Sequence, residues 1–321
     1  MSATVRIGTC SWADETLTKV WYPKGVRSGE ARIRHYAERF DTVEANSTYY
    51  RLPDAELVAN WAERTPDGFT MHVKAFGLMT RHPVKLESLP EDLRDVMPVD
   101  ERGRVDRPSR ELRAELFRRF ARALEPLRER GKLGGILLQF PSYVVYKPAS
   151  LDYIEWAVGQ LGGDQPLVEF RHRSWLDEEN RAQTLAFLES LGATYVIVDA
   201  PKTEAKNLVP TVIARTSKTA YVRFHGRNAG TWNKRSGSAA ERFDYLYSEE
   251  ELAEWVAPLR ELAGETDSVY AMFNNNGRSA MPATGLEGLA PEEVAGDPSK
   301  GEVAQAPANA LMLQRLLASG S

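Results

Sequence analysis

Cysteine and long apolar runs are both scarce in this 321-residue chain. Its single cysteine, Cys10, excludes an intramolecular disulfide and a zinc site built from several cysteines, and such low usage is typical of a reducing compartment. No run of about 18 apolar residues occurs, which is the length that a membrane-spanning helix needs. The first residues, Met1 to Arg6, also lack the apolar core of a signal peptide. The sequence therefore predicts a cytoplasmic protein without a membrane partner.

The chain also lacks a strong charge of either sign. It has 41 basic and 45 acidic side chains, a formal net charge of −4, so nothing draws the whole molecule to a phosphate backbone. Binding of nucleic acid would need a local basic patch, and the best candidate is the arginine-rich stretch 102–132. Acidic side chains interrupt that stretch at Glu111, Glu115, Glu125 and Glu129, which favours a solvated helix face. A nucleic-acid partner is therefore unlikely on this reading, and the composition leaves the oligomeric state open.

Hydrophobic residues make up 42% of the chain, enough for a large core, and they gather in short runs between helical patterns. Parallel strands need crossover connections, so alternating strands and helices predict a parallel sheet. Eight strand-and-helix units favour a closed (β/α)8 barrel of the TIM type, built as one domain over residues 1–321. The predicted strands are Val5–Thr9, Thr42–Asn46, Phe69–Lys74, Gly135–Phe140, Leu167–Phe170, Thr194–Asp199, Ala220–His225 and Val269–Asn274.

Two segments carry clear sequence signals of a helix, and two long stretches carry no regular pattern of secondary structure. Apolar residues at spacings of three and four predict a helix over Glu111–Glu129, and Ser248 with Glu251 forms a capping-box pattern at the start of another. Residues 85–108 follow the third strand, and residues 278–307 follow the eighth. Both are predicted to lie on the face of the barrel where its strands end, which is where such barrels keep their sites. Each stretch could be a lid or a disordered surface excursion.

Polar residues alternate with apolar ones inside the predicted strands. In the second strand, Thr42, Glu44 and Asn46 share one face, and the same parity holds for the polar residues of the other strands. The face toward the surrounding helices must be apolar, so the polar face must point to the barrel axis. The further axial polar residues are His72 and Lys74 of the third strand, Glu169 and Arg171 of the fifth, Arg223 and His225 of the seventh, and Asn274 at the end of the eighth.

Charges inside a barrel have to be paired or else neutralised. Glu44 and Glu169 can pair with the cations of neighbouring strands, either as a structural ion-pair network or as part of a ligand site. For Arg6, near the start of its strand, we expect a structural role. For the others, a position at or near the end of the strand favours a ligand site, in which we expect the charges to be partly solvated.

These residue types fit acid–base chemistry on a small anion. Glu44, Glu169 and His225 are the candidate catalytic groups. Lys74, Arg171 and Arg223 would bind the anion, with the amides Asn46, Gln139 and Asn274 beside them. Trp12, Tyr49 and Trp232 could supply a wall on which a sugar or base stacks. The leading hypothesis is a cofactor-independent hydrolase, lyase or isomerase that acts on a phosphorylated sugar or a nucleotide-like substrate.

Two other classes of function remain open. A metal-dependent hydrolase would use Glu44, His72, Glu169 and His225 as ligands. The interleaved cations would repel a divalent ion and no HExxH spacing is present, so we predict no metal. A barrel that binds a ligand or nucleic acid without catalysis is the other alternative. We interpret Cys10 as a small buried residue, since no histidine adjoins it in the sequence.

Eight short stretches, spread over nearly the whole chain, carry a resemblance to a known family: GTCSW (8–12), FDTVEANSTYYRLP (40–53), VKA (73–75), TRH (80–82), LLQFP (137–141), VEFRHRSW (168–175), YVRFHGR (221–227) and FNNN (273–276). In these stretches the chain resembles the domain of unknown function 72 family, the YecE-like proteins. The resemblance implies a TIM-type barrel and no settled activity. This chain differs by having Ala45 where a bulkier aliphatic residue is expected, and by a longer loop after Asn276.

Overall fold

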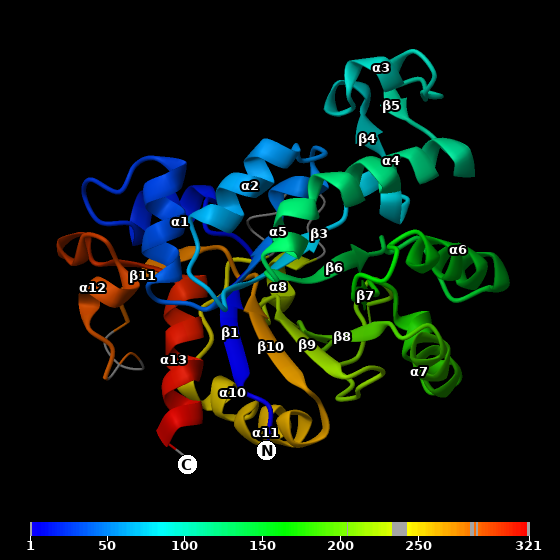
Figure 1. The fold of residues 1–321 in the computed structure, drawn as a ribbon. Helices are drawn as coiled ribbons and strands as arrows, with labels where there is room; N and C mark the ends of the chain where they lie inside the picture. The colour runs from blue at the N-terminus through cyan, green and yellow to red at the C-terminus, as the bar shows by residue number, and fades with distance from the viewer. Residues whose placement is uncertain (1, 204, 233–242, 283–285, 287, 320–321) are drawn as a thin grey trace.

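A computed structural model describes residues 2–203, 205–232, 243–282, 286 and 288–319. Eight parallel strands close into a barrel in chain order, and the last strand pairs with the first through a ladder that runs from Val5 with Val269 to Thr9 with Phe273 (Figure 1). The predicted closed (β/α)8-type barrel is therefore confirmed. The strands are β1 (Val5–Thr9), β2 (Thr42–Ala45), β3 (Thr70–Lys74), β6 (Leu133–Gln139), β7 (Pro166–Glu169), β8 (Thr194–Asp199), β9 (Thr219–Phe224) and β10 (Ser268–Phe273).

Helices surround the barrel, and four of the main ones begin at a capping side chain. Ser28, Asp54, Ser109 and Ser248 each accept a hydrogen bond from a backbone N–H of the first helical turn. Within the described part of the chain, no helix is long and apolar enough to cross a membrane. The main helices are α1 (Gly29–Ala37), α2 (Ala55–Glu63), α4 (Arg110–Ala123), α5 (Glu125–Glu129), α6 (Pro148–Gly159), α7 (Arg181–Ser190), α10 (Glu249–Ala253), α11 (Val256–Glu265) and α13 (Gln305–Ser319).

The ring of helices departs from the predicted regularity in two places. The helix predicted over Glu111–Glu129 is broken at Leu124 into α4 and α5, because Pro126 has no N–H to continue the hydrogen-bond ladder. Between β8 and β9, residues 200–218 contain no helix where the structure describes them. The predicted capping box is present: Ser248 and Glu251 each bond the other's backbone at the start of α10.

Both long excursions follow the carboxyl ends of their strands, as predicted, and both carry secondary structure. The first, between β3 and α4, contains the antiparallel pair β4 (Val84–Lys85) and β5 (Arg104–Val105), with α3 (Glu91–Arg94) between them (Figure 1). Leu89, Leu93 and Met97 bury their side chains there. The second contains the pair β11 (Arg278–Ala280) and β12 (Glu302–Ala304), with α12 (Pro291–Val294) between them. A disordered excursion is therefore wrong for the described residues of both stretches.

The lower barrel interior separates Arg6 from the charges nearer the strand ends. Arg6 donates to the carbonyl of Gly68 (3.0 Å) and pairs with Asp41 (3.7 Å), a structural role at the start of β1. Above it the His72 ring packs between two tyrosine rings, with centroids 4.8 Å from Tyr221 and 4.2 Å from Tyr270. Burial, reinforced by the charge of Arg6, lowers the pKa of His72 to about 3.

The His72 ring of this aromatic layer leaves no room for a side chain at the facing position of β6. A Cβ atom at Gly134 of β6 would come within 2.5 Å of Cε1 of His72. Only glycine fits beside the imidazole, which explains the glycine at this height of β6.

Candidate functional site

The deepest part of the site is an ion pair between Arg223 of β9 and Glu44 of β2, on opposite sides of the barrel. Arg223 donates through Nη2 to Oε1 of Glu44 (2.7 Å) and through Nε to Oε2 (3.1 Å). The hydroxyl of Tyr221, two residues before Arg223 on the same face, donates to the same Oε2 (2.8 Å). Neither charged side chain has any exposed surface. Glu44 is thus fully engaged, and its role is to hold Arg223.

Glu169, at the end of β7, accepts hydrogen bonds from three side chains. Arg223 donates through Nη1 to its Oε2 (2.5 Å), and Gln139 of β6 and Arg171 donate to its Oε1 (2.8 and 3.1 Å). Burial alone would raise the pKa of Glu169, but the Arg223 guanidinium, with His225 and Arg171, holds that pKa well below its usual range. Glu169 is therefore an ionised acceptor without an exposed oxygen.

His225, just past the end of β9, is neutral and held in one tautomer. Burial lowers its pKa to about 3, against the opposing effect of Glu169. Its Nε2 lies 3.1 Å from Oε1 of Glu169, and the amide of Asn274 lies 3.0 Å from its Nδ1. Because Oε1 can only accept, we assign the proton to Nε2, which leaves Nδ1 to accept from Asn274.

Above this enclosed network lies a partly exposed rim. We use the word rim for the side chains of Asn46, Tyr49, Lys74, Gln139 and Arg171, which all keep some contact with solvent. Nζ of Lys74 donates to Oε1 of Gln139 (2.9 Å) and lies 4.5 Å from the centre of the Tyr49 ring. Arg171 keeps 17% of its side chain exposed while it bonds Glu169. The rim therefore presents an amine and a guanidinium to whatever enters the barrel mouth.

The charges of the site do not cancel. Among the described residues of the site, the cations Lys74, Arg171 and Arg223 face the two carboxylates Glu44 and Glu169, which leaves one positive charge in excess. Burial, followed by the charge of Arg223, lowers the pKa of Lys74 to about 8, so its amine is mostly protonated at neutral pH. Both carboxylates are enclosed while Lys74 and Arg171 lie at the rim, so the charge that the described residues expose there is positive.

Several residues predicted for the site are placed differently. Trp12 is buried against Trp61 of α2, with ring centroids 5.3 Å apart, because an apolar ring at this height packs on the helix layer. The side chain of Trp232 lies outside the described residues. Glu44, Glu169, Arg223 and His225 were expected to be partly solvated and instead have no exposed surface. Their strand ends are covered by the rim side chains, which the strand pattern alone does not reveal.

The four residues of the metal hypothesis are not assembled into one site. His72 lies in the aromatic layer, where neither ring nitrogen has a hydrogen-bond partner in the described structure, and Glu44 is occupied by Arg223. Among the described residues, no three His, Cys, Asp or Glu side chains are grouped as metal ligands.

Three residues of functional interest were missed. Tyr221 shares the parity of Arg223 and so could have been found from the strand pattern. His82, after η3 (Gly77–Thr80), packs its ring 5.1 Å from that of Tyr49, and burial and Lys74 lower its pKa to about 3. Asp199, at the end of β8, accepts from Trp255, and this contact has no signal in the sequence.

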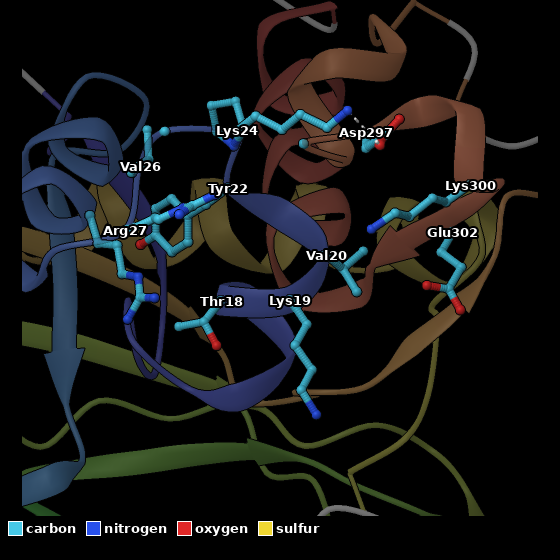
Figure 2. Close-up of a pocket in the computed structure, with 14 residues that line it drawn as sticks. Thr18, Lys19, Val20, Tyr22, Lys24, Val26, Arg27, Asp297, Lys300 and Glu302 are labelled. Atoms are coloured by element: carbon cyan, nitrogen blue, oxygen red, sulfur yellow. Dashed lines mark ion pairs between the residues drawn. The ribbon is translucent and has the colours of Figure 1, made fainter.

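A second basic region lies apart from the barrel mouth. A cavity of about 190 Å³ lies between η1 (Leu17–Trp21), the chain leading into α1, and residues 296–302, and it shares no lining residue with the network (Figure 2). Figure 2 shows Lys24 directed toward Asp297, 3.8 Å away. Its other basic lining residues are Lys19, Arg27, Arg32 and Lys300. This cavity is the natural competitor of the barrel mouth for an anion.

Taken together, the closed parallel barrel and the charged mouth at its strand ends define a TIM-type α/β barrel protein. The chain belongs to the family described as "Protein of unknown function DUF72", whose model matches residues 6–300. The resemblance drawn from the sequence is thereby confirmed.

The chain is similar to several proteins over most of its length. The chain is 30% identical over 304 residues to UPF0759 protein YunF of Bacillus subtilis, which covers 90% of this chain and 99% of the relative. It is 28% identical over 229 residues to UPF0759 protein YecE of Escherichia coli, covering 66% and 74%. A crystal structure of a DUF72 family protein from Thermotoga maritima superposes with a TM-score of 0.71 at 29% identity, covering 98% and 99%. These descriptions assign the family and the fold without an activity.

Proposed function

We propose that this protein is an enzyme that binds a small anionic substrate, such as a phosphorylated sugar or a nucleotide, at the mouth of the barrel. The observation that carries the proposal is the placement of Lys74 and Arg171 at the rim of an enclosed network, in which the described residues carry one excess positive charge. An anion that enters the mouth would neutralise this excess. Arg171 offers it a planar fork and Lys74 a point charge.

The proposed acid–base group is Lys74 rather than a carboxylate. A catalytic acid or base works best when its pKa lies near the working pH, and the pKa of Lys74, at about 8, is close to it. Glu44 and Glu169 each accept hydrogen bonds at both oxygens inside the network, so neither can reach a substrate. Their proposed roles are to fix Arg223 and Arg171, and His225 in turn positions Glu169.

Unsatisfied amide oxygens support a substrate that also carries hydroxyl groups. Oδ1 of Asn46 is buried without a hydrogen-bond partner in the described structure, while its Nδ2 donates to the carbonyl of Cys10 (2.7 Å). Oδ1 of Asn276, just past the end of β10, is likewise buried and unpaired. Such acceptors at the strand ends suit hydroxyl donors from a sugar.

Thermal unfolding in increasing concentrations of inorganic phosphate tests this proposal. Phosphate that binds the folded state should raise the melting temperature by mass action. Arg171→Gln should reduce that rise strongly. Lys24→Gln, which removes a cation from the cavity of Figure 2, should leave it unchanged. A rise that survives in Arg171→Gln and disappears in Lys24→Gln would move the anion site to the cavity and refute the proposal.

A further inference from the structure

Lys74 stands out among the charged groups of the barrel because its amine has no carboxylate within ion-pair distance in the described structure. In the described structure the amine makes one hydrogen bond, to the neutral amide oxygen Oε1 of Gln139, and it also lies over the face of Tyr49. A lysine that serves only as a structural cation normally meets an anion when it is removed from water. The amine of Lys74 is therefore held in position without being neutralised by an ion pair.

The amine also lies where a carbonyl compound could reach it. Lys74 is the last residue of β3, on the C-terminal face of the barrel, and it keeps partial contact with solvent. Gln139, the hydrogen-bond partner of Lys74, also bonds Glu169, and Glu169 in turn bonds Arg171. Arg171 would bind an anionic group of the same molecule. An amine, a guanidinium and an aromatic ring, all partly exposed, thus belong to the same rim.

We infer that Lys74 is a nucleophilic amine that forms a Schiff base with the aldehyde or ketone group of an anionic substrate. This inference rests on the proposed function, since it assigns the substrate class and the first chemical step to the same site. Desolvated lysines that lack a carboxylate partner are the ones that proteins use for such chemistry.

The step balances without a cofactor. The lone pair of neutral Nζ adds to the carbonyl carbon, the carbonyl electron pair moves to oxygen, and that oxygen takes up a proton. The hydroxyl of the resulting carbinolamine takes a second proton from solvent and leaves as water, while the nitrogen lone pair forms the C=N bond of a protonated Schiff base. The proton that left the nitrogen on addition goes to solvent, with which Lys74 keeps partial contact.

The electrostatics of the site favour the neutral amine that this step needs. Burial and then Arg223 lower the pKa of Lys74 to about 8, Glu44 and Glu169 oppose this change, and Arg171 adds to it. Two further titratable groups near Lys74 are neutral: His82, whose pKa is lowered by burial to about 3, and Tyr49, whose pKa is raised by burial to about 12. At pH 7 the fraction of free amine is therefore roughly two-hundredfold that of an exposed lysine with a pKa of about 10.4.

Reductive trapping with glyoxylate, a small anionic aldehyde, tests the inference on the wild-type protein. Cyanoborohydride delivers hydride to the C=N carbon and fixes the adduct as a carboxymethyl amine, which peptide mapping assigns to a residue. We expect Lys74 to be modified well before the exposed Lys24, with a midpoint near pH 8, and we expect phosphate to slow the reaction at Lys74 alone. Lys74→Arg should abolish the early adduct.

Lys132 is an internal control for burial. Its amine is also buried, but it donates to the carbonyls of Ala62 (2.7 Å) and Thr65 (2.6 Å), away from the mouth, and it should stay unmodified. Modification of Lys74 no faster than of Lys24 would overturn the Schiff base. If phosphate still stabilised the protein through Arg171, the proposed function would stand without the Schiff base. If neither the preferential modification of Lys74 nor the stabilisation by phosphate were observed, both proposals would be refuted.

Discussion

Arg223 and Glu44 form a fully enclosed, two-point ion pair across the barrel axis, with Nη2 2.7 Å from Oε1 and Nε 3.1 Å from Oε2. The fork of the guanidinium matches the two carboxylate oxygens, so the pair fixes orientation as well as charge. Because Nη1 of the same guanidinium reaches Glu169, Arg223 sets the position of the residue that contacts Arg171 and His225. The inner pair thereby determines the geometry of the mouth.

Breaking the inner pair should be costly. Glu44→Gln keeps the size of the side chain but leaves Arg223 with an uncompensated buried charge, and we expect a loss of about 3–5 kcal/mol in the free energy of unfolding. Glu169→Gln should cost a similar amount, since Glu169 is equally enclosed. Denaturant titrations measure both losses. Glu38→Gln, in the exposed pair with Arg39, is the control and should change stability by less than about 0.5 kcal/mol. Losses no larger than the control would mean that the network does not hold the barrel together.

The stability of the protein should fall on acidification below pH 6.5, in part because of His72. Its pKa is about 3 in the folded protein against a reference of 6.5. Between these values the unfolded chain binds a proton that the folded chain does not, so stability decreases as the pH falls. His72→Leu removes this group, together with its two unpaired nitrogens.

Over the range from pH 6 to pH 4, His72→Leu should flatten the dependence of the free energy of unfolding on pH by about 1.4 kcal/mol per pH unit. His82 and His225 should maintain the remaining slope, because their pKa values are also about 3. Chemical unfolding at a series of pH values provides the comparison. Parallel curves for wild type and variant would show that His72 does not stay neutral in the barrel.

A further buried carboxylate, that of Asp199, should contribute to the stability of the protein without taking part in anion binding at the barrel mouth. Asp199 accepts from Nε1 of Trp255 (2.8 Å), the hydroxyl of Tyr247 (2.9 Å) and Nη2 of Arg227 (2.7 Å). Asp199→Asn replaces an acceptor oxygen with a donor amide facing these donors, and we expect a loss of about 2–4 kcal/mol. Asp267→Asn, which affects an exposed pair with Lys218, is the matched control in the same unfolding experiment. Phosphate should still stabilise Asp199→Asn, and loss of that response would link Asp199 to the anion site.

Sequence patterns were sufficient to predict the barrel, because strand parity and the alternation of strands with helices can both be recognised within short segments of the chain. Strand parity assigned Glu44, Glu169 and Arg223 to the axis, and strand–helix alternation predicted closure. How deeply each polar side chain is buried was not predictable from these patterns. Whether Glu169 meets solvent depends on how the side chains of Gln139 and Arg171 cover it, and these come from other parts of the chain. The same holds for Trp12, whose partner on α2 is about 50 residues away.

A crystal soaked in selenate would show whether the rim of the barrel binds an anion. Selenium gives an anomalous signal that locates the ion without reference to any assumed site. We expect a peak within hydrogen-bonding distance of Nζ of Lys74 and the guanidinium of Arg171, and loss of that peak in Arg171→Gln. A peak confined to the basic cavity beside Lys24 and Lys300, with the barrel mouth empty of selenate, would contradict this expectation.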